Sequence, residues 1–390
     1  DYKRKILVRR KYLKNELKIT YTPNLNKKDQ LRMILRHVGI EPDIYTKNGD
    51  KVAATGKTPS FQSLKTDDET LEWYFQRKPH PILKAVMQAR KFQTLYNYLY
   101  SYSQHVDADW KIHSTLNLTG TRETRQSSDS PNQQNITAVL DRLFVPPPET
   151  VWLDSDAVNI ELRIWAYSVK NKELIDMFEK GKSVHKMIMN LLHPTEYKVY
   201  SKGVPDDHPT AKTYRKCKEG TFALIYGATE ETADKAYGYA GATKKVFDKF
   251  PGIKEFTEFL VKSTEANAEI YMYPSVFTLF GYRLDVPPKE PFKACNYYVQ
   301  GTAGQIMGRM MLVVDANPFY QESGSKIIQQ VHDKLRIQIP ISKWTRPVID
   351  EIKKSMTNCC LPVMKTPVDE KIRYRPEDKE RLQQLGVLAV

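Results

Sequence analysis

The sequence has few of the features that mark disulfide-rich, zinc-binding or membrane proteins. Its 390 residues include only four cysteines, and none of them has the C-x-x-C spacing of a zinc site. The chain contains no run of about 18 apolar residues, no signal peptide and no internal repeat. Nothing in the sequence therefore places the protein in or across a membrane, and we expect a cytoplasmic protein.

Acidic residues are fewer than basic ones. The chain has 60 Lys and Arg against 46 Asp and Glu, and its formal charge is +14. This excess favours a polyanionic partner, because basic side chains that bind nucleic acid release its counterions. Ribosomal and membrane-surface proteins are basic too, so the charge alone does not choose among these classes. The length exceeds that of a single typical core, and we expect two or three subdomains.

Two short apolar segments far apart in the chain end in aspartates. In 151–156 the alternation puts Asp154 and Asp156 on one face of an expected strand, and 327–331 reads as a second strand that leads to Asp333. An isolated aspartate in such a place is usually a turn residue or a helix cap. As a pair, two such carboxylates can hold the two metal ions, roughly 4 Å apart, that phosphoryl transfer uses. Hard oxygen ligands of this kind suit Mg²⁺.

Residues 210–227 are expected to form a helix. At about 100° per residue, Lys218, Phe222 and Tyr226 share a stripe roughly 80° wide. Such a cation can meet a triphosphate, and the aromatic rings can stack on a nucleotide and a template base. The alternative is an ordinary amphipathic helix with a lysine that reaches solvent and two core aromatics. Gly227 indicates a helix end or a hinge.

The order of these and further motifs resembles family A of the DNA polymerases, the bacterial and phage DNA polymerase I group, from about residue 57 to the end. Residues 156–163 resemble its motif A, 218–227 its motif B, and His332-Asp333 its motif C. Residues 127–136 are similar to the segment along the primer-template minor groove, and 296–303 to the helix that touches the nascent duplex. Five motifs in one order are a strong signal, whereas any single one is weak.

The resemblance implies an α+β right-hand polymerase with a thumb, a palm that holds an antiparallel sheet, and helical fingers. The expected bounds are 1–115 for an N-terminal segment and thumb, 116–168 and 285–390 for the two parts of the palm, and 169–284 for the fingers. We expect no proofreading exonuclease in this chain, because too few residues precede the thumb to build one. The expected setting is the cytoplasm of a bacterial or phage-infected cell, with an organelle as the alternative.

The implied activity is template-directed DNA synthesis from dNTPs on primer-template DNA, by a monomer with two Mg²⁺ ions as cofactors. A first alternative is a reverse transcriptase or dual-template enzyme that accepts an RNA template, and no residue decides it. A second alternative is a catalytically inactive nucleic-acid-binding protein on a polymerase fold, which only Lys334 and Tyr214 support. Glu161 disfavours a single-subunit RNA polymerase, because the family's glutamate obstructs the 2′-hydroxyl of a ribonucleotide.

The family's functional residues fall on the following positions of this sequence. The metal ligands are Asp156, Asp333 and the backbone at Ala157, and the catalytic residues are Asp156, Asp333 and Lys218. The nucleotide-binding residues are Arg215, Lys218, Phe222, Tyr226, Glu161 and His185. The primer- and template-binding residues are Arg125, Asn132, Gln134, Asn135, Arg283, Asn296, Gln300 and His332. A lone histidine such as His185 is more often a surface or capping residue.

In three places the sequence departs from the family. Tyr214 stands where an arginine is expected; the helical wheel puts Arg215 about 20° and Lys212 about 40° from Tyr226, but Tyr214 about 120° away. We therefore expect Arg215 to clamp phosphate, with Lys212 in reserve. The insertion 121–124 leaves open whether Arg122 or Arg125 reaches the minor groove.

Lys334 replaces the glutamate that usually follows the motif C aspartate. The reversed charge weakens the negative potential beside the metals. The alternative is that Lys334 faces away from them, because neighbours along a strand point to opposite sides. Asp154 either supplies a compensating negative charge or is structural.

Overall fold

The computed structural model describes residues 2–18, 23–40, 66–118, 120–201, 203–205, 208–359, 365–386 and 388. The chain divides into two compact units. The first comprises Asp1–His113 with Ile136–Asp141, and the second comprises Ser114–Asn135 with Arg142–Val390. The boundaries of thumb, palm and fingers stay predictions.

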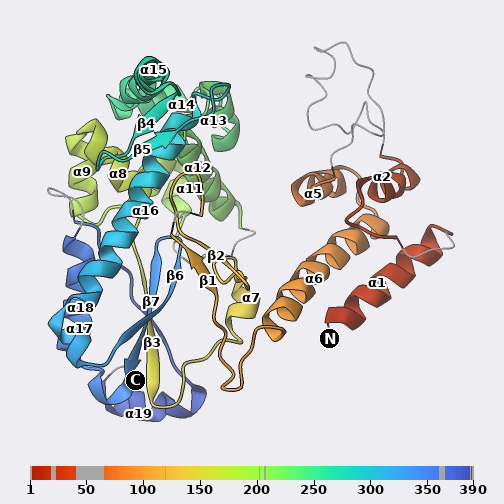
Figure 1. The fold of residues 1–390 in the computed structure, drawn as a ribbon. Helices are drawn as coiled ribbons and strands as arrows, with labels where there is room; N and C mark the ends of the chain where they lie inside the picture. The colour runs from red at the N-terminus through yellow and green to blue at the C-terminus, as the bar shows by residue number, and fades with distance from the viewer. Residues whose placement is uncertain are drawn as a thin grey trace. The chain divides into compact units, whose positions relative to one another are not determined.

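The first unit is helical (Figure 1). Its helices are α1 (Tyr2–Glu16), α2 (Lys28–His37), α5 (Asp68–Arg77), α6 (Pro81–Ser103) and α7 (Ala138–Asp141). A break before Pro81, which lacks an N–H and begins α6, separates α5 from α6. The Asp67 side chain caps α5, and the His80 ring caps α6. Helices α1 and α6 pack together around buried residues that include Leu13 and Leu83.

The second unit is built on a four-stranded antiparallel sheet in the order β6-β7-β3-β8. Its strands are β3 (Thr150–Asp156), β6 (Lys326–Val331), β7 (Lys334–Pro340) and β8 (Lys371–Arg373). The register between β3 and β7 runs from Thr150 opposite Pro340 to Asp156 opposite Lys334. The strands predicted at 151–156 and 327–331 are thus confirmed, and their pairing through β7 brings both ends to the same region.

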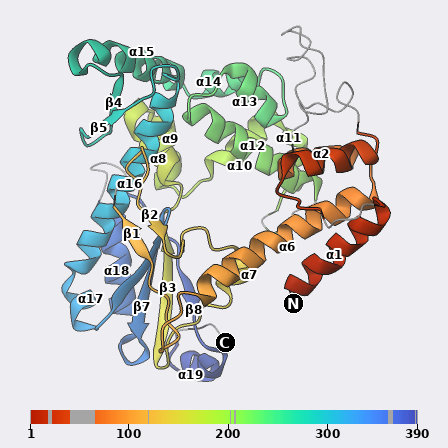
Figure 2. The same ribbon diagram turned by 45° about the vertical axis from the view of Figure 1, so that its right-hand side comes forward.

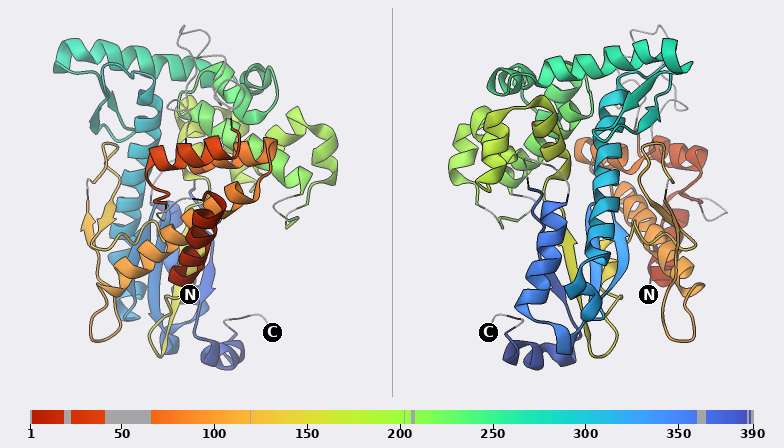
Figure 3. Two further views of the ribbon diagram at one scale, coloured as in Figure 1. Left: turned by 90° about the vertical axis from the view of Figure 1, so that its right-hand side faces the viewer. Right: turned by 60° about the vertical axis from the view of Figure 1, so that its left-hand side comes forward.

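The two faces of this sheet differ in chemistry. Val151, Leu153 and their partners on β7 are buried in the hydrophobic core that helices α16 (Lys293–Asp315) and α18 (Arg346–Asn358) share. Figure 3 shows these two helices running along the sheet. The opposite face carries Asp154 and Asp156, because side chains alternate along a strand. The remaining helices of this region are α17 (Pro318–Glu322) and α19 (Lys379–Gln384).

Helices gather at the end of the sheet where β3 finishes, whereas α19 lies at the other end (Figure 2). They are α8 (Ile160–Val169), α9 (Lys172–Glu179), α10 (Val184–Leu192), α11 (Pro194–Val199), α12 (Pro209–Ile225), α13 (Glu230–Tyr237), α14 (Ala242–Lys249) and α15 (Ile253–Tyr271). Two hairpins complete the unit, β1 (Thr115–Asn117) with β2 (Ser127–Asp129) and β4 (Ser275–Phe277) with β5 (Arg283–Asp285). This mixture of helices and antiparallel strands confirms the α+β class. Among the described helices, none combines the length and apolar character needed to span a bilayer.

Candidate active site

Three aspartates meet at the end of β3. Asp156 is the last residue of that strand, and Asp333 lies in the short turn between β6 and β7. The N–H of Ala157 donates to the Asp333 carbonyl at 2.8 Å, and the N–H of Asp369 donates to the Asp156 carbonyl at 2.9 Å. His332 closes the turn in a left-handed conformation, with φ 54°. These backbone hydrogen bonds therefore fix the positions of the residues that carry the three carboxylates.

The carboxylates repel one another. Burial first, and then the charges of Asp333 and Asp369, raise the pKa of Asp156 to about 6, against the opposing charges of Lys334 and Lys218. A cation bound among these groups would relieve that repulsion. Sequence reasoning missed Asp369, which belongs to no motif and approaches Asp156 only through the pairing of distant segments.

Two carboxylates fit a Mg²⁺ site that a substrate completes. Among the described residues, no group of three or more His, Cys, Asp and Glu side chains gathers closely enough to cage a metal. Mg²⁺ in proteins is commonly held by one or two carboxylates together with substrate phosphates and water. Asp156 and Asp333 match that requirement, and the ligand role of the Ala157 backbone stays a prediction.

Asp156→Asn is expected to stabilise the metal-free protein above pH 6. The folded pKa of Asp156, about 6, exceeds the ordinary value of roughly 3.9, so the stability contributed by its protonated form is lost as pH rises through 6. Asparagine stays neutral and avoids this loss. The loss begins above the unfolded pKa and is complete above pH 6, so thermal unfolding with a chelator should show a higher midpoint for the variant at pH 8 and a clearly smaller difference at pH 4.5. An identical difference at both pH values would contradict the assignment.

Glu161 joins three segments beside the aspartates. It lies in the first turn of α8 and accepts hydrogen bonds from the Tyr226 hydroxyl at 2.6 Å and from Arg125 Nη2 at 2.7 Å. The side chain of Gln300 on α16 also hydrogen-bonds to Tyr226. Burial and the Glu161 charge raise the pKa of Tyr226, so its hydroxyl keeps the proton that it donates. The predicted site residues Glu161, Tyr226, Arg125 and Gln300 are thus brought together.

Tyr226 is positioned by the end of α12. The predicted helix at 210–227 is confirmed as Pro209–Ile225, with Tyr226 as its C-cap and Gly227 in the left-handed region at φ 82°. A Cβ on Gly227 would approach the Phe292 carbonyl to 2.7 Å. Both the conformation and the space therefore require glycine directly after the tyrosine.

The aromatic stripe of α12 continues from Tyr226 towards Lys218. The Tyr226 and Phe222 ring centres are 5.9 Å apart, and Lys218 Nζ lies 5.8 Å from the Phe222 ring centre. His185 of α10 contacts Phe222 and is 3% exposed, with no hydrogen-bond partner at either ring nitrogen among the described residues. Burial and Lys218 lower the pKa of His185 to about 4, so it is neutral. The interpretation of His185 as a surface or capping residue is wrong.

Tyr214 belongs to the same aromatic group. Its ring stacks on Tyr200 with centres 5.0 Å apart, and it meets His185 edge-on at 6.2 Å. Lys186 Nζ lies 5.5 Å from the Tyr200 ring centre. Arg215 is exposed, and its phosphate-clamping role stays a prediction.

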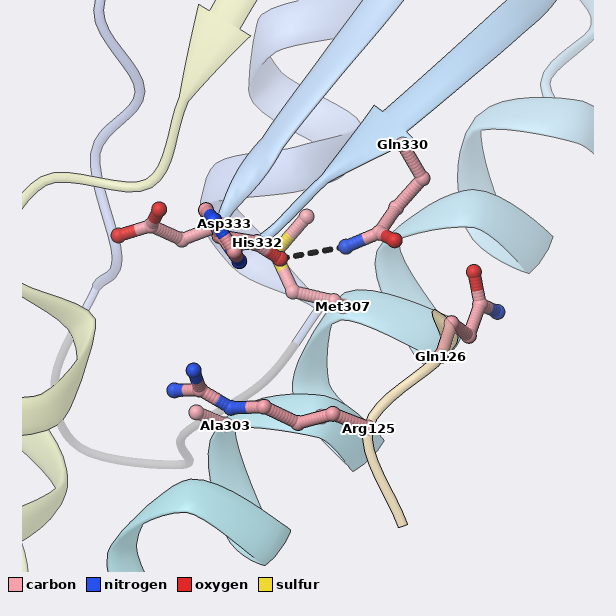
Figure 4. A pocket seen from close by; sticks show the side chains of 8 residues that line it. Arg125, Gln126, Ala303, Met307, Gln330, His332 and Asp333 are labelled. Carbon is pink, nitrogen blue, oxygen red and sulfur yellow. Dashed lines mark hydrogen bonds between the residues drawn. The ribbon is translucent and has the colours of Figure 1, made fainter. Parts of the chain in front are cut away.

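The predicted primer-binding loop is attached to the turn that carries Asp333. Gln134 Nε2 donates to Gln330 Oε1 at 2.9 Å, and Gln330 donates to the His332 carbonyl. Figure 4 shows the pocket formed there, with Arg125 reaching past Ala303 of α16. Gln126, Gly304, Met307, Gln330, His332 and Asp333 complete its lining. The lining thus combines polar side chains with Ala303, Gly304 and Met307, and it includes Asp333.

The other predicted primer and template residues have different surroundings. Asn132 accepts hydrogen bonds from the N–H groups of Gln134 and Asn135 and so shapes the loop. Asn296 lies on α16, and its Oδ1 is buried without a partner among the described residues. Arg283 of β5 pairs with Asp285 at 3.4 Å and lines a separate cavity with Arg122 of the insertion. Arg125, by contrast, reaches Glu161.

Comparison with known proteins agrees with the motifs. The model of DNA polymerase family A matches residues 3–375, so the match includes the N-terminal helices that the motif comparison from about residue 57 left out. The DNA polymerase I of Streptococcus pneumoniae is 30% identical over 286 residues, which are 67% of this chain and 31% of that protein. The enzyme of Aquifex aeolicus is 26% identical over 325 residues, 80% of this chain and 53% of that protein. The thermostable DNA polymerase I of Thermus aquaticus is 28% identical over 347 residues, 81% of this chain and 37% of that protein.

This chain spans between about a third and about half of the length of these relatives. A solved structure shares its fold: the POL domain of Pol1 from M. smegmatis, in complex with DNA primer-template and dNTP. The TM-score is 0.78 at 22% identity, over 95% of this chain and 64% of that chain. With the family model matching nearly all of its residues, the chain belongs to DNA polymerase family A.

Proposed function

We propose that this chain is a template-directed DNA polymerase that extends a primer 3′ end with dNTPs. The observation that carries the proposal is the meeting of Asp156 and Asp333 at one end of the sheet, with Lys218 close enough to influence the pKa of Asp156. The primer 3′-oxygen bonds to the α-phosphorus, the bond from that phosphorus to the oxygen bridging the β-phosphate breaks, and pyrophosphate and a proton leave. Mg²⁺ held by the two carboxylates would favour the 3′-alkoxide and offset charge on the leaving group.

The surroundings of the aspartates support binding of a triphosphate. Lys218 is exposed beside the aromatic stripe, and neutral His185 has two buried ring nitrogens without partners among the described residues. A phosphate oxygen can accept a hydrogen bond from the protonated ring nitrogen, and the lysine adds a positive charge. Arg215 is proposed as a further phosphate contact.

The proposed partners are primer-template DNA and dNTPs, and the proposed form is a monomer that acts in the cytoplasm. The polar pocket beside Asp333, the net charge of +14 and the fold shared with a Pol1 domain that holds primer-template and dNTP support this choice. An RNA template is the alternative. Among the described residues, no contact distinguishes the two templates.

Primer extension with Mg²⁺ on DNA and RNA templates, with dNTPs or rNTPs, tests the proposal. The expected result is extension of a DNA primer with dNTPs on DNA. Equal extension on RNA would establish a dual-template enzyme instead. No extension by a folded protein that binds primer-template would favour the inactive binding protein and would overturn the proposal.

Glu161→Ala is expected to raise ribonucleotide incorporation on the order of a hundredfold relative to deoxynucleotides, because the side chain that occupies the space of a 2′-hydroxyl is removed. Glu161 is only 15% exposed and is held by Tyr226 and Arg125, so its bulk is fixed in place. Single-nucleotide incorporation kinetics measure the ratio. Glu161→Gln retains the bulk and serves as the matched control; equal ratios in both variants would contradict steric exclusion.

A further inference from the structure

Charged side chains form a row on one face of the sheet that carries the aspartates. Asp154 lies opposite Arg336, and Asp156 lies opposite Lys334, in the register of β3 and β7. Residues directly opposite each other in an antiparallel pair point to the same face. The cations of β7 therefore lie beside the carboxylates of β3, and the alternative that Lys334 faces away from them is wrong.

Asp154 is held mainly by guanidinium groups. It is 4% exposed, and it accepts from Arg336 Nε at 2.6 Å and Nη2 at 3.0 Å and from Arg373 Nε at 2.8 Å. Lys334 Nζ is farther away, 3.8 Å from Asp154 Oδ2, and its side chain is 23% exposed. Two arginines thus donate short hydrogen bonds to Asp154, while Lys334 lies at the end of the row where Asp156 stands opposite it.

At one end, this row meets the carboxylate cluster, which consists of Asp156, Asp333 and Asp369. Lys334 is directly opposite Asp156 and immediately follows Asp333 in the chain. The lysine charge opposes the combined effect of burial, Asp333 and Asp369 on the pKa of Asp156. In the metal-free protein it therefore offsets part of the repulsion among the three aspartates.

We propose that Lys334 is a resident cation of the carboxylate cluster and weakens the affinity of Asp156 and Asp333 for divalent metal. This inference rests on the proposed function, because it takes those two carboxylates to be the metal ligands. A positive charge on the same face of the sheet as Asp156 repels a dication bound there, and partly buried charges are poorly screened by salt. Metal loading then depends on the oxygen ligands that a bound nucleotide contributes.

Mn²⁺ binding to the purified chain, followed by the electron paramagnetic resonance of free Mn²⁺ without DNA or nucleotide, tests this role. Lys334→Met is expected to bind Mn²⁺ roughly tenfold more tightly than the unmodified protein, and Lys334→Glu more tightly still. Lys334→Arg keeps the charge and should keep the original Kd. Lys326→Glu makes the same charge change at an exposed position at the far end of β6, and its Kd should change by less than about twofold.

Asp333→Asn distinguishes a failure of the role proposed for Lys334 from a failure of the proposed metal site. If Mn²⁺ binding requires Asp333 but has the same Kd in the Met, Glu and Arg variants of Lys334, the resident-cation role is overturned and the metal site stands. If no variant shows Asp333-dependent binding, the resident-cation role is overturned, and primer extension alone decides the proposed function. Unfolding midpoints are measured first, and if Lys334→Glu destabilises the fold, the comparison of Lys334→Met with Lys334→Arg decides.

Discussion

Replacing Asp333 with alanine is expected to lower the rate of primer extension at least about a thousandfold while leaving primer-template binding intact. The turn that holds Asp333 is fixed by the backbone bond from Ala157, so removal of the carboxylate changes the chemistry of the site more than its shape. Interactions aimed at charge that develops in a transition state commonly contribute two to three orders of magnitude each, and a metal ligand acts through the metal as well. Single-turnover extension with saturating dNTP measures the loss.

Asp315→Ala provides the matched control for this prediction, because it removes an exposed aspartate at the end of α16. Its extension rate should stay within about twofold of the original, as for an ordinary surface substitution. Binding of a labelled primer-template by both variants, measured by fluorescence anisotropy, separates catalysis from association. Extension by Asp333→Ala at a tenth of the original rate or more would remove this residue from the catalytic centre.

Asp154→Ala is expected to lower the free energy of unfolding by about 3 to 5 kcal/mol, because it leaves buried guanidinium groups without their carboxylate. Arg336 has only 3% of its side chain exposed and would lose the carboxylate that offsets its charge, while Gln329 Oε1 still accepts from its Nη1 at 2.9 Å. Burial raises the pKa of Asp154, but Arg336, Lys334 and Arg373 outweigh it, so the net pKa lies below its usual range. The stability that this carboxylate contributes is present near neutral pH and lost as pH falls through the folded pKa.

Urea unfolding at pH 7.5 measures the effect, and the Asp154→Leu/Arg336→Leu double variant is the informative partner. Replacement of both members of a buried ion pair by apolar groups is often neutral, so the double variant should recover the part of the loss that comes from Arg336, while Arg373 still lacks Asp154. A single-variant loss below about 1 kcal/mol would show that Arg336 finds another anion or water. Of the two roles open for Asp154, compensating charge or structure, this network supports the structural one.

Local patterns in the sequence predicted the elements that carry the site. Alternation placed Asp156 at the end of a strand, and the helical period grouped Lys218 with Phe222 and Tyr226, because both signals lie within a few residues. What surrounds those elements depends on segments distant in the chain. Asp369 precedes β8, and its N–H donates to the Asp156 carbonyl beside the bridge between Ala157 and Val368.

Tyr214 shows the limit of the helical wheel. The sequence predicts the angle between Tyr214 and Tyr226 on α12, and that angle alone places Tyr214 outside the aromatic stripe. Tyr200, which lies outside α12, stacks on Tyr214, and Tyr214 itself meets His185 of α10 edge-on. A helical wheel describes one helix by itself, and it contains no information about rings supplied by other segments.

The position of β3 in the middle of the sheet has a consequence for synthesis of the chain on the ribosome. Both of its neighbours, β7 and β8, lie more than 170 residues later in the sequence. At about 5 to 20 residues per second, β3 waits on the order of 10 to 40 seconds for both partners. An unpaired strand with two open edges invites pairing with other chains, and charged side chains oppose it. The charges of Asp154 and Asp156 would oppose such pairing while β3 waits for β7 and β8.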